Sequence, residues 1–297
     1  MAQKYGFELE TYGLTESEIS DAITSVAGEA YYGHFYYHGS RSLGLRSKEN
    51  GMGNLWVSEN DSSIEPGYEE EVGDTDHEVI SPIVEGREGI ETVCRVVNAL
   101  RRAGAKFNDN CSIHLTFGME NSSARWNRMS AKKKAKVIVK LVEFFQYFQD
   151  GIMTLLPARR NPTLSGHART YCMTSRVNRD YDRLGLPVGN AQAIVRDMVD
   201  YERGQINVQN LFSKGIIEFR SLEMTFDTHR IRTWALLMHK ILSYCVTSVS
   251  NGQYEAFSNN TDSLEGLLFQ IKAGKDLIKD CDRMACKNLL QEFGMVA

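Results

Sequence analysis

The stretch GFELE at residues 6–10 decides the fold of this 297-residue chain. Side chains alternate between the two faces of a β-strand. Glu8 and Glu10 therefore share one face, and Phe7 and Leu9 share the other. A strand of this kind has an apolar side that can pack on helices and an acidic side that stays available for chemistry.

The same alternation recurs in two later segments, SIHLT at residues 112–116 and IEFR at residues 217–220. His114 falls on the polar side of the first segment, and Glu218 and Arg220 fall on the polar side of the second. If the three strands join one sheet, its polar face collects carboxylates, a histidine and an arginine. Such a face suits a divalent cation and phosphate groups.

The overall composition is that of an ordinary globular protein, with 42% hydrophobic and 24% charged residues. A formal net charge of −4 gives no indication of a general nucleic-acid binder. No stretch approaches the roughly 20 apolar residues of a membrane span, and the first residues lack the apolar core of a signal peptide. We therefore expect a cytoplasmic protein with neither nucleic acid nor membrane as a partner.

Six cysteines are present, and no two of them form a CxxC pair. Cysteines in apolar surroundings of a cytoplasmic chain are typically free, buried thiols. The spacing therefore argues against a zinc site built from them.

Hydrophobic periodicity predicts strands and helices that alternate along the chain without a clear linker. Strands are expected at residues 5–11, 54–60, 78–84, 108–118, 205–208 and 216–222, and helices at residues 15–26, 87–103, 131–150, 190–203, 228–249, 262–273 and 276–293. A long polar segment, 158–190, carries six arginines and is expected to be a functional loop. The simplest architecture is one α+β domain, with antiparallel strands and helices segregated to one face.

Each polar motif also has a plainer interpretation when it is taken alone. Paired glutamates can lie on a solvated edge strand, a strand histidine can be a hydrogen-bonded core residue, and a Glu-x-Arg pair can be a structural ion pair. Asp61 can be a turn residue that bonds its own backbone, and Glu78 can be an exposed strand end. The recurrence of one facial pattern in several segments favours the functional interpretation.

Common nucleotide signatures are absent from the sequence. There is no GxxxxGK[ST] loop and no GxGxxG turn. A bound nucleotide would therefore be held by metal, arginine and the polar sheet face, without a phosphate-binding loop.

The motifs occur in an order that resembles the amidoligase family, carboxylate–amine ligases related to glutamate–cysteine ligase and glutamine synthetase. The ordered set is GFELE at 6–10, Trp56 with DSS at 61–63, EVISPI at 78–83, CSIH at 111–114, LPAR at 156–159, INV at 206–208 and IEFR at 217–220. The resemblance covers residues 4–245, and residues 246–297 form C-terminal helices outside it. It implies a single catalytic domain over residues 1–297.

The resemblance implies a curved antiparallel sheet that forms a funnel of the glutamine synthetase and glutamate–cysteine ligase type, with helices packed on its outer face. ATP and two or more Mg²⁺ ions, for which Mn²⁺ can substitute, would lie on the polar face. The implied metal ligands are Glu8, Glu10, Glu78, His114 and Glu218. The implied nucleotide-binding residues are Arg220, Arg159, Arg160 and Asn207, and the implied catalytic residues are Arg220, Asp61 and Glu218.

The implied activity is an ATP- and Mg²⁺-dependent ligation of a carboxylate to an amine through an acyl phosphate. The amine and the acid can each come from an amino acid, a peptide or a protein, and the oligomeric state stays open. Two alternatives are a phosphotransferase to a nitrogen nucleophile and a non-catalytic binding protein on the same fold. The second is favoured by Ser112 and Thr116, which stand where the family usually has glycine and a second histidine.

Overall fold

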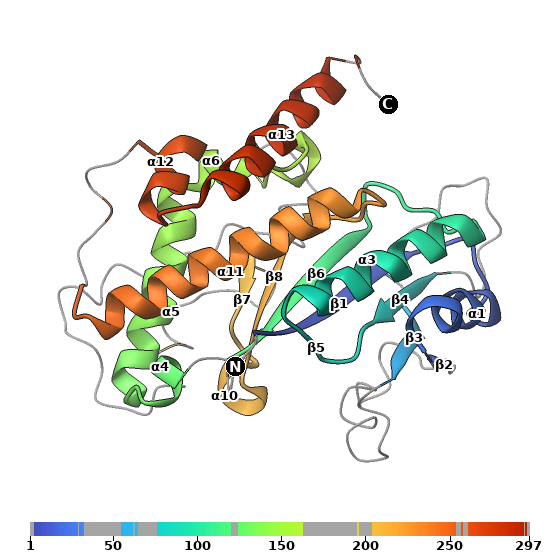
Figure 1. Ribbon diagram of the computed structural model, residues 1–297, viewed down its shortest axis with the longest axis horizontal. Helices are drawn as coiled ribbons and strands as arrows, with labels where there is room; N and C mark the ends of the chain where they lie inside the picture. Colours follow the sequence, from blue (N-terminus) through green and yellow to red (C-terminus); the bar gives the residue numbers. More distant parts are fainter. Residues whose placement is uncertain are drawn as a thin grey trace. The chain divides into compact units, whose positions relative to one another are not determined.

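The computed structural model describes residues 3–28, 30–32, 55–61, 63–64, 76–119, 124–162, 195, 204–253, 257, 261–293 and 295. The chain divides into two compact units. The N-terminal unit comprises Ala2–Phe117 and Leu222–Arg232, and the C-terminal unit comprises Gly118–Ser221 and Thr233–Ala297. Figure 1 shows the ribbon of both units.

The N-terminal unit carries an open sheet with the strand order β2-β3-β4-β1-β6, and β5 pairs with the other end of β1. The strands are β1 (Lys4–Thr11), β2 (Ala30–Tyr32), β3 (Trp56–Asn60), β4 (His77–Ile80), β5 (Val84–Glu85) and β6 (Ser112–Gly118). β4 runs antiparallel to both β1 and β3, whereas β2 runs parallel to β3. The unit is thus a mixed helix and largely antiparallel sheet structure, with one parallel pair that the sequence did not indicate.

One face of this sheet is apolar and is covered by α1 (Glu16–Ala27) and α3 (Gly86–Ala103), which lie side by side (Figure 1). Leu9 and Val79 are directly opposite each other in the register and are completely buried. Burial of one such side chain contributes about 2 kcal/mol. The helix that hydrophobic periodicity predicts at residues 87–103 is confirmed as α3. Its apolar stripe is at most 2% exposed and comprises Ile90, Val93, Val97 and Leu100.

Helix α1 begins as the sequence predicts. The hydroxyl of Thr15 accepts a hydrogen bond from the backbone N–H of Glu18, and the carboxylate of Glu18 accepts one from the backbone N–H of Thr15. This capping box satisfies two N–H groups that have no partner within the helix. It fixes where the chain leaves β1 and turns onto the apolar face.

The C-terminal unit contains most of the remaining helices and the short pair of strands β7 and β8. Its elements are α4 (Ala124–Asn127), α5 (Ala131–Tyr147), α6 (Gln149–Met153), the 3-10 helix η1 (Ala158–Arg160), β7 (Ile206–Asn207), α10 (Leu211–Lys214), β8 (Ile216–Glu223), α11 (Thr228–Ser250), α12 (Leu264–Gln270) and α13 (Lys275–Glu292). The last residues of β8 and the first turn of α11 belong to the N-terminal unit. The predicted helix 131–150 is divided into two helices. α5 ends at Tyr147 with Phe148 as its C-cap, and α6 begins at Gln149.

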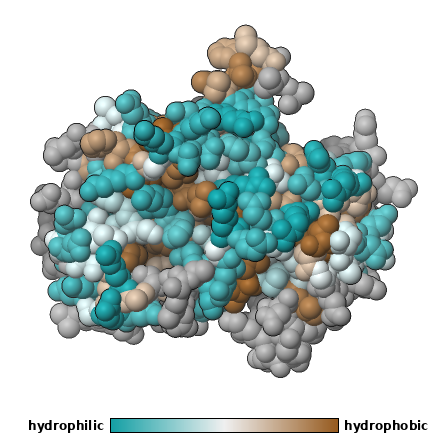
Figure 2. Space-filling model, in the orientation of Figure 1, coloured by the Kyte–Doolittle hydropathy of each residue, from teal (hydrophilic) through white to brown (hydrophobic). Residues whose placement is uncertain are grey.

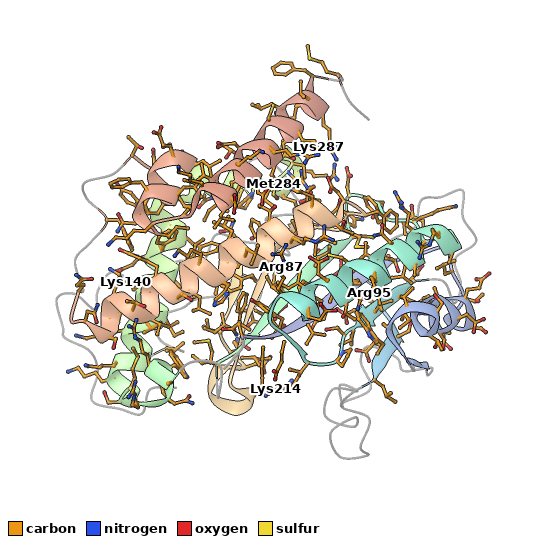
Figure 3. All side chains as sticks on the ribbon, viewed as in Figure 1. Arg87, Arg95, Lys140, Lys214, Met284 and Lys287 are labelled. Atoms are coloured by element: carbon orange, nitrogen blue, oxygen red, sulfur yellow. The ribbon has the colours of Figure 1, made fainter. Side chains whose placement is uncertain are left out.

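Helix α5 is buried around most of its circumference after an exposed first turn. Its Phe144 packs edge-on to Phe257 at a ring-centroid distance of 5.3 Å. Lys140, labelled on α5 in Figure 3, places its ammonium group 4.6 Å from the ring centroid of Phe257. The aromatic faces stabilise this buried cation.

Four of the six cysteines are buried free thiols, in agreement with the sequence: Cys94, Cys111, Cys245 and Cys281. Cys286 is also free but exposed, because it lies on the outer face of α13, opposite the buried Cys281 and Met284. Just beyond the end of α13, Phe293 is 74% exposed and Met295 is 69% exposed. Figure 2 shows an apolar patch at this end of the helix.

Three parts of the sequence lie mostly outside the described residues. They are the aromatic stretch 31–38, for which the sequence suggests a strand or a substrate-facing loop, the arginine-rich segment 158–190 and the predicted helix 190–203. In the described part of the chain, no helix has the length and apolar character needed to cross a membrane.

Candidate functional site

Three glutamates form a row across neighbouring strands of the N-terminal unit. Glu10 on β1 lies directly opposite Glu78 on β4, and Glu78 lies directly opposite Glu59 on β3. Directly opposite residues of antiparallel strands project from the same face. The row therefore stands on the face opposite Leu9 and Val79, which is the face that the sequence predicts to be polar.

His114 on β6 stands next to this row and contacts two carboxylates of β1. Its Nδ1 atom is 3.0 Å from Oε2 of Glu8, and its Nε2 atom is 3.4 Å from Oε1 of Glu10. The Nδ1 atom is also 4.0 Å from Oε1 of Glu78. The imidazole is only 7% exposed. Both ring nitrogens therefore face carboxylate oxygens in a largely desolvated position.

Glu10 is held in place by the backbone of β6 as well. Its Oε2 atom accepts a hydrogen bond of 2.5 Å from the backbone N–H of Ser112. A carboxylate that accepts from a backbone donor is fixed in orientation. The other oxygen of Glu10 points to His114.

The carboxylates and the imidazole form two overlapping groups, in each of which the ligand atoms lie within 4.8 Å of one another. One group comprises Glu8, Glu78 and His114, and the other comprises Glu10, Asp61 and Glu78. Glu78 belongs to both groups. Spacings of this size allow several ligands to reach one cation, since oxygen and nitrogen ligands bind Mg²⁺ at about 2.1 Å.

Asp61 also has the turn role that its position suggested. Its Oδ1 atom accepts a hydrogen bond of 2.8 Å from the backbone N–H of Ser63, and its own N–H donates to the carbonyl of Asp76. The residue is 4% exposed. The turn therefore positions the carboxylate of Asp61 at the end of β3, beside Glu10 and Glu78.

Burial, together with the crowding of carboxylates, raises the pKa of two of them. Burial is the largest cause for Glu78, followed by the charges of Glu8, Glu10, Asp61 and Glu59, and together they raise its pKa well above the usual value. Burial, with the charges of Glu8 and Asp61, raises the pKa of Glu59 to about 7. A cation at this position would relieve the repulsion and favour the ionised carboxylates.

We expect the metal-free protein to lose stability as the pH rises from 5 to 8. A glutamate with a raised pKa holds its proton in the folded state at a pH where the unfolded chain has lost it, so the free energy of unfolding falls with rising pH. For Glu59 the loss is about 2 kcal/mol after a discount for solvent screening. Thermal unfolding in a chelator at both pH values measures it.

Glu59→Gln is the matched variant for this prediction. Its melting temperature should fall less between pH 5 and pH 8 than that of the wild type. Addition of Mg²⁺ at pH 8 should restore the melting temperature that the wild type loses. An equal fall in the variant and the wild type would contradict the assignment of the titrating group to Glu59.

Three predicted site residues come together in the C-terminal unit. Asn207 on β7 lies directly opposite Glu218 on β8, and its Nδ2 atom donates a hydrogen bond of 2.9 Å to Oε2 of Glu218. Nη1 of Arg220 donates to Oε1 of the same carboxylate at 2.5 Å. Glu218 and Arg220 thus form the ion pair that the sequence allowed, and Asn207 orients it.

The two arginines that follow Pro157 have different exposures. Arg160 is fully buried at the end of η1, and Arg159 is partly exposed. Their assignment to nucleotide binding stays a prediction, as do the metal-binding and catalytic roles of the residues above.

Sequence reasoning missed Glu59. The only feature of the sequence that could have indicated Glu59 is its position two residues after Val57 and two residues before Asp61. The neighbours of Glu59 in the sequence do not alternate between polar and apolar side chains. The pairing of β3 with β4 brings it opposite Glu78, and that pairing cannot be derived from the sequence of β3 alone.

The fold and the site define a mixed helix and sheet protein with a carboxylate-rich sheet face. The family model described as "Putative amidoligase enzyme" matches residues 1–242. The chain therefore belongs to the amidoligase family, whose name denotes a ligase-type enzyme, and the resemblance inferred from the ordered motifs is confirmed.

A comparison with curated proteins found no match. The solved structures include one described as "Crystal structure of novel glutamine synthase homolog", which is similar to 97% of this chain at 14% sequence identity and a TM-score of 0.35. This chain spans 65% of the length of that structure.

Proposed function

We propose that this protein is an ATP- and Mg²⁺-dependent carboxylate–amine ligase that forms an amide or isopeptide bond through an acyl phosphate. The observation that carries the proposal is the pair of overlapping ligand groups that share Glu78 on the polar face of the N-terminal sheet. Membership of the amidoligase family supports the same class of reaction. We also propose that the two units act as one catalytic domain on a funnel-shaped sheet.

The ligand set fits Mg²⁺ better than a softer metal. It consists of carboxylate oxygens with one imidazole nitrogen, and Mg²⁺ prefers hard oxygen ligands while keeping several waters. We assign Glu8, Glu10, Glu78 and His114 as ligands, with Glu218 as a further one. When bound, the ions would neutralise the negative charge of the ATP phosphates and of the transferred phosphoryl group.

Several protein groups keep the ligands ready for this role. His114 fixes the orientation of Glu8 through the 3.0 Å contact, and the N–H of Ser112 fixes Glu10. Asn207 orients Glu218. In this proposal Arg220 contacts a phosphate oxygen and stabilises the charge that develops on the transferred group.

The reaction needs activation because a carboxylate is a poor electrophile for an amine. An oxygen of the acid attacks the γ-phosphorus of ATP, and ADP leaves. The amine nitrogen then attacks the acyl carbon, inorganic phosphate leaves, and the amine gives its proton to a carboxylate. Asp61 is our candidate for this base, because it lies among the ligands and is held by a turn.

Phosphate release from ATP by the purified protein tests the proposal. We expect release that requires both Mg²⁺ and a pool of amino acids and amines, and that stops when a chelator removes the metal. Mass spectrometry of the pool should then reveal an amide product in the same amount as the released phosphate. A stable phosphorylated product would establish a phosphotransferase instead. ATP binding without release in any mixture would favour a non-catalytic binding protein.

A further inference from the structure

Four polar residues form a block on the β7–β8 pair of the C-terminal unit. The register places Asn207 opposite Glu218, and the backbone N–H of Arg220 donates to the carbonyl of Gln205 at 3.0 Å. Gln205 therefore continues the register opposite Arg220. Because side chains alternate along each strand, all four residues project from one face. The alternate residues Ile206 and Phe219 project from the other face and are completely buried.

Asn207 and Glu218 are both hydrogen-bonded within this block. Asn207 donates from Nδ2 to Glu218, and its Oδ1 atom accepts from the backbone N–H of Gln209 at 3.1 Å. Both ends of the Asn207 amide have partners, which fixes its orientation. Oε2 of Glu218 accepts a hydrogen bond from Asn207, and Oε1 of Glu218 accepts one from Arg220.

Gln205 differs from Asn207 and Glu218 in this respect. It is 1% exposed, yet within the part of the chain that the structure describes its Nε2 atom donates no hydrogen bond. A buried amide donor without an acceptor costs free energy, and native proteins leave few of them. The backbone of Gln205 is anchored by Arg220, so the side chain is held on a rigid strand pair. An oxygen acceptor supplied from outside the protein would satisfy it.

We propose that Gln205 donates a hydrogen bond from Nε2 to an anionic oxygen of a ligand that Arg220 also contacts. A guanidinium beside an amide donor on one sheet face is suited to an oxyanion. The oxyanion is either a phosphate of the nucleotide or the carboxylate of the acid substrate. This identity rests on the proposed function, whereas the oxyanion site itself does not. Gln205 then has a specific role in ligand binding that the ordered motifs did not indicate.

The test compares Gln205→Met with the wild type. Methionine keeps the length of the side chain and removes the donor. We expect the melting temperature of the ligand-free variant to be unchanged or higher, because an unsatisfied buried donor is gone. We expect its affinity for the oxyanion to fall about tenfold or more, which is the typical effect of losing a hydrogen bond to a charged group. Gln205→Glu replaces the donor with a negative charge and should weaken binding further.

Gln209→Met is the matched control, because Gln209 is exposed and contributes only its backbone N–H to the block. Three probes distinguish the source of the oxyanion: Mg²⁺-ATP, inorganic phosphate and sodium glutamate, each titrated by calorimetry. Weakened binding of ATP and phosphate in Gln205→Met assigns a phosphate oxygen, and weakened binding of glutamate alone assigns a carboxylate. Both results support the proposal if Gln209→Met binds like the wild type.

Binding of every probe by Gln205→Met within twofold of the wild type would overturn the inference, since a buried water would then be the only partner of Nε2. If that variant also keeps ATP turnover, the proposed ligase function survives without this inference. If inorganic phosphate binds in a way that depends on Gln205 but Mg²⁺-ATP does not bind, the result would support the inference and count against the ligase. No binding of any probe to the wild type would overturn both.

Discussion

Glu78→Gln is expected to lower the ATP-dependent reaction by about 10³-fold or more while leaving the fold intact. Glu78 is the residue that both ligand groups share, so its loss removes a ligand from each. Metal ions contribute several kcal/mol of charge stabilisation in reactions of this kind, and each 1.36 kcal/mol corresponds to a factor of ten in rate. Glutamine keeps the shape of the side chain but is a weaker ligand without a charge.

The stability of this variant separates a lost site from a lost fold. Burial and four neighbouring carboxylates already raise the pKa of Glu78, so a neutral amide should not lower the melting temperature of the metal-free protein at pH 8. The stabilisation that Mg²⁺ provides should be largely lost. Glu85→Gln is the control, because Glu85 lies on β5, is exposed and pairs with Lys4. Activity of Glu78→Gln within tenfold of the wild type would refute the metal assignment.

Gly151→Ala is expected to destabilise the C-terminal unit by about 3 kcal/mol, or roughly 6–12 °C in melting temperature. A Cβ atom at Gly151 on α6 would lie 2.6 Å from the backbone nitrogen of Leu264 and 2.6 Å from the carbonyl carbon of Ser263, at the start of α12. These are backbone atoms, and the N–H of Gly151 also donates to the carbonyl of Asp262 at 3.0 Å. Relief would require α12 to move away.

Helix propensity predicts the opposite sign for this substitution, because alanine in a helix is favoured over glycine by about 1 kcal/mol. The sign of the measured change in stability therefore decides whether the close approach of α6 and α12 outweighs the gain in helix propensity. Gly274→Ala is the matched control. Its Cβ would meet nothing within 4 Å, and its φ of −72° suits any residue. A stabilised Gly151→Ala variant, measured by thermal unfolding, would show that the two helices do not pack as described.

Local patterns in the sequence were sufficient for the apolar half of the fold. The alternation in β1 and the helical period of α3 depend on the residues of each segment alone, and both predictions are confirmed. The structure brings Glu8, Glu10, Glu78 and His114 together, and their role as metal ligands, which the family resemblance implies, stays a prediction. That resemblance depends on the order of the motifs along the whole chain, and no single strand contains this information.

The sequence could not reveal features that depend on how distant strands align. Glu59 and Gln205 look like ordinary polar residues at strand ends, and only the register with Glu78 and Arg220 brings them onto the polar faces. The parallel pairing of β2 with β3 is of the same kind. Pairing is decided by long-range packing and turn geometry, neither of which is visible in a short window.

Ser112 and Thr116 are the two positions that depart from the family motif. At Ser112 the contact with Glu10 is made by the backbone and not by the side chain. The donor is the main-chain N–H, which nineteen of the twenty amino acids carry and only proline lacks. The hydrogen bond to Glu10 therefore does not depend on which side chain, serine or glycine, stands at position 112. Any residue except proline at position 112 can make this hydrogen bond as long as β6 keeps its alignment with β1.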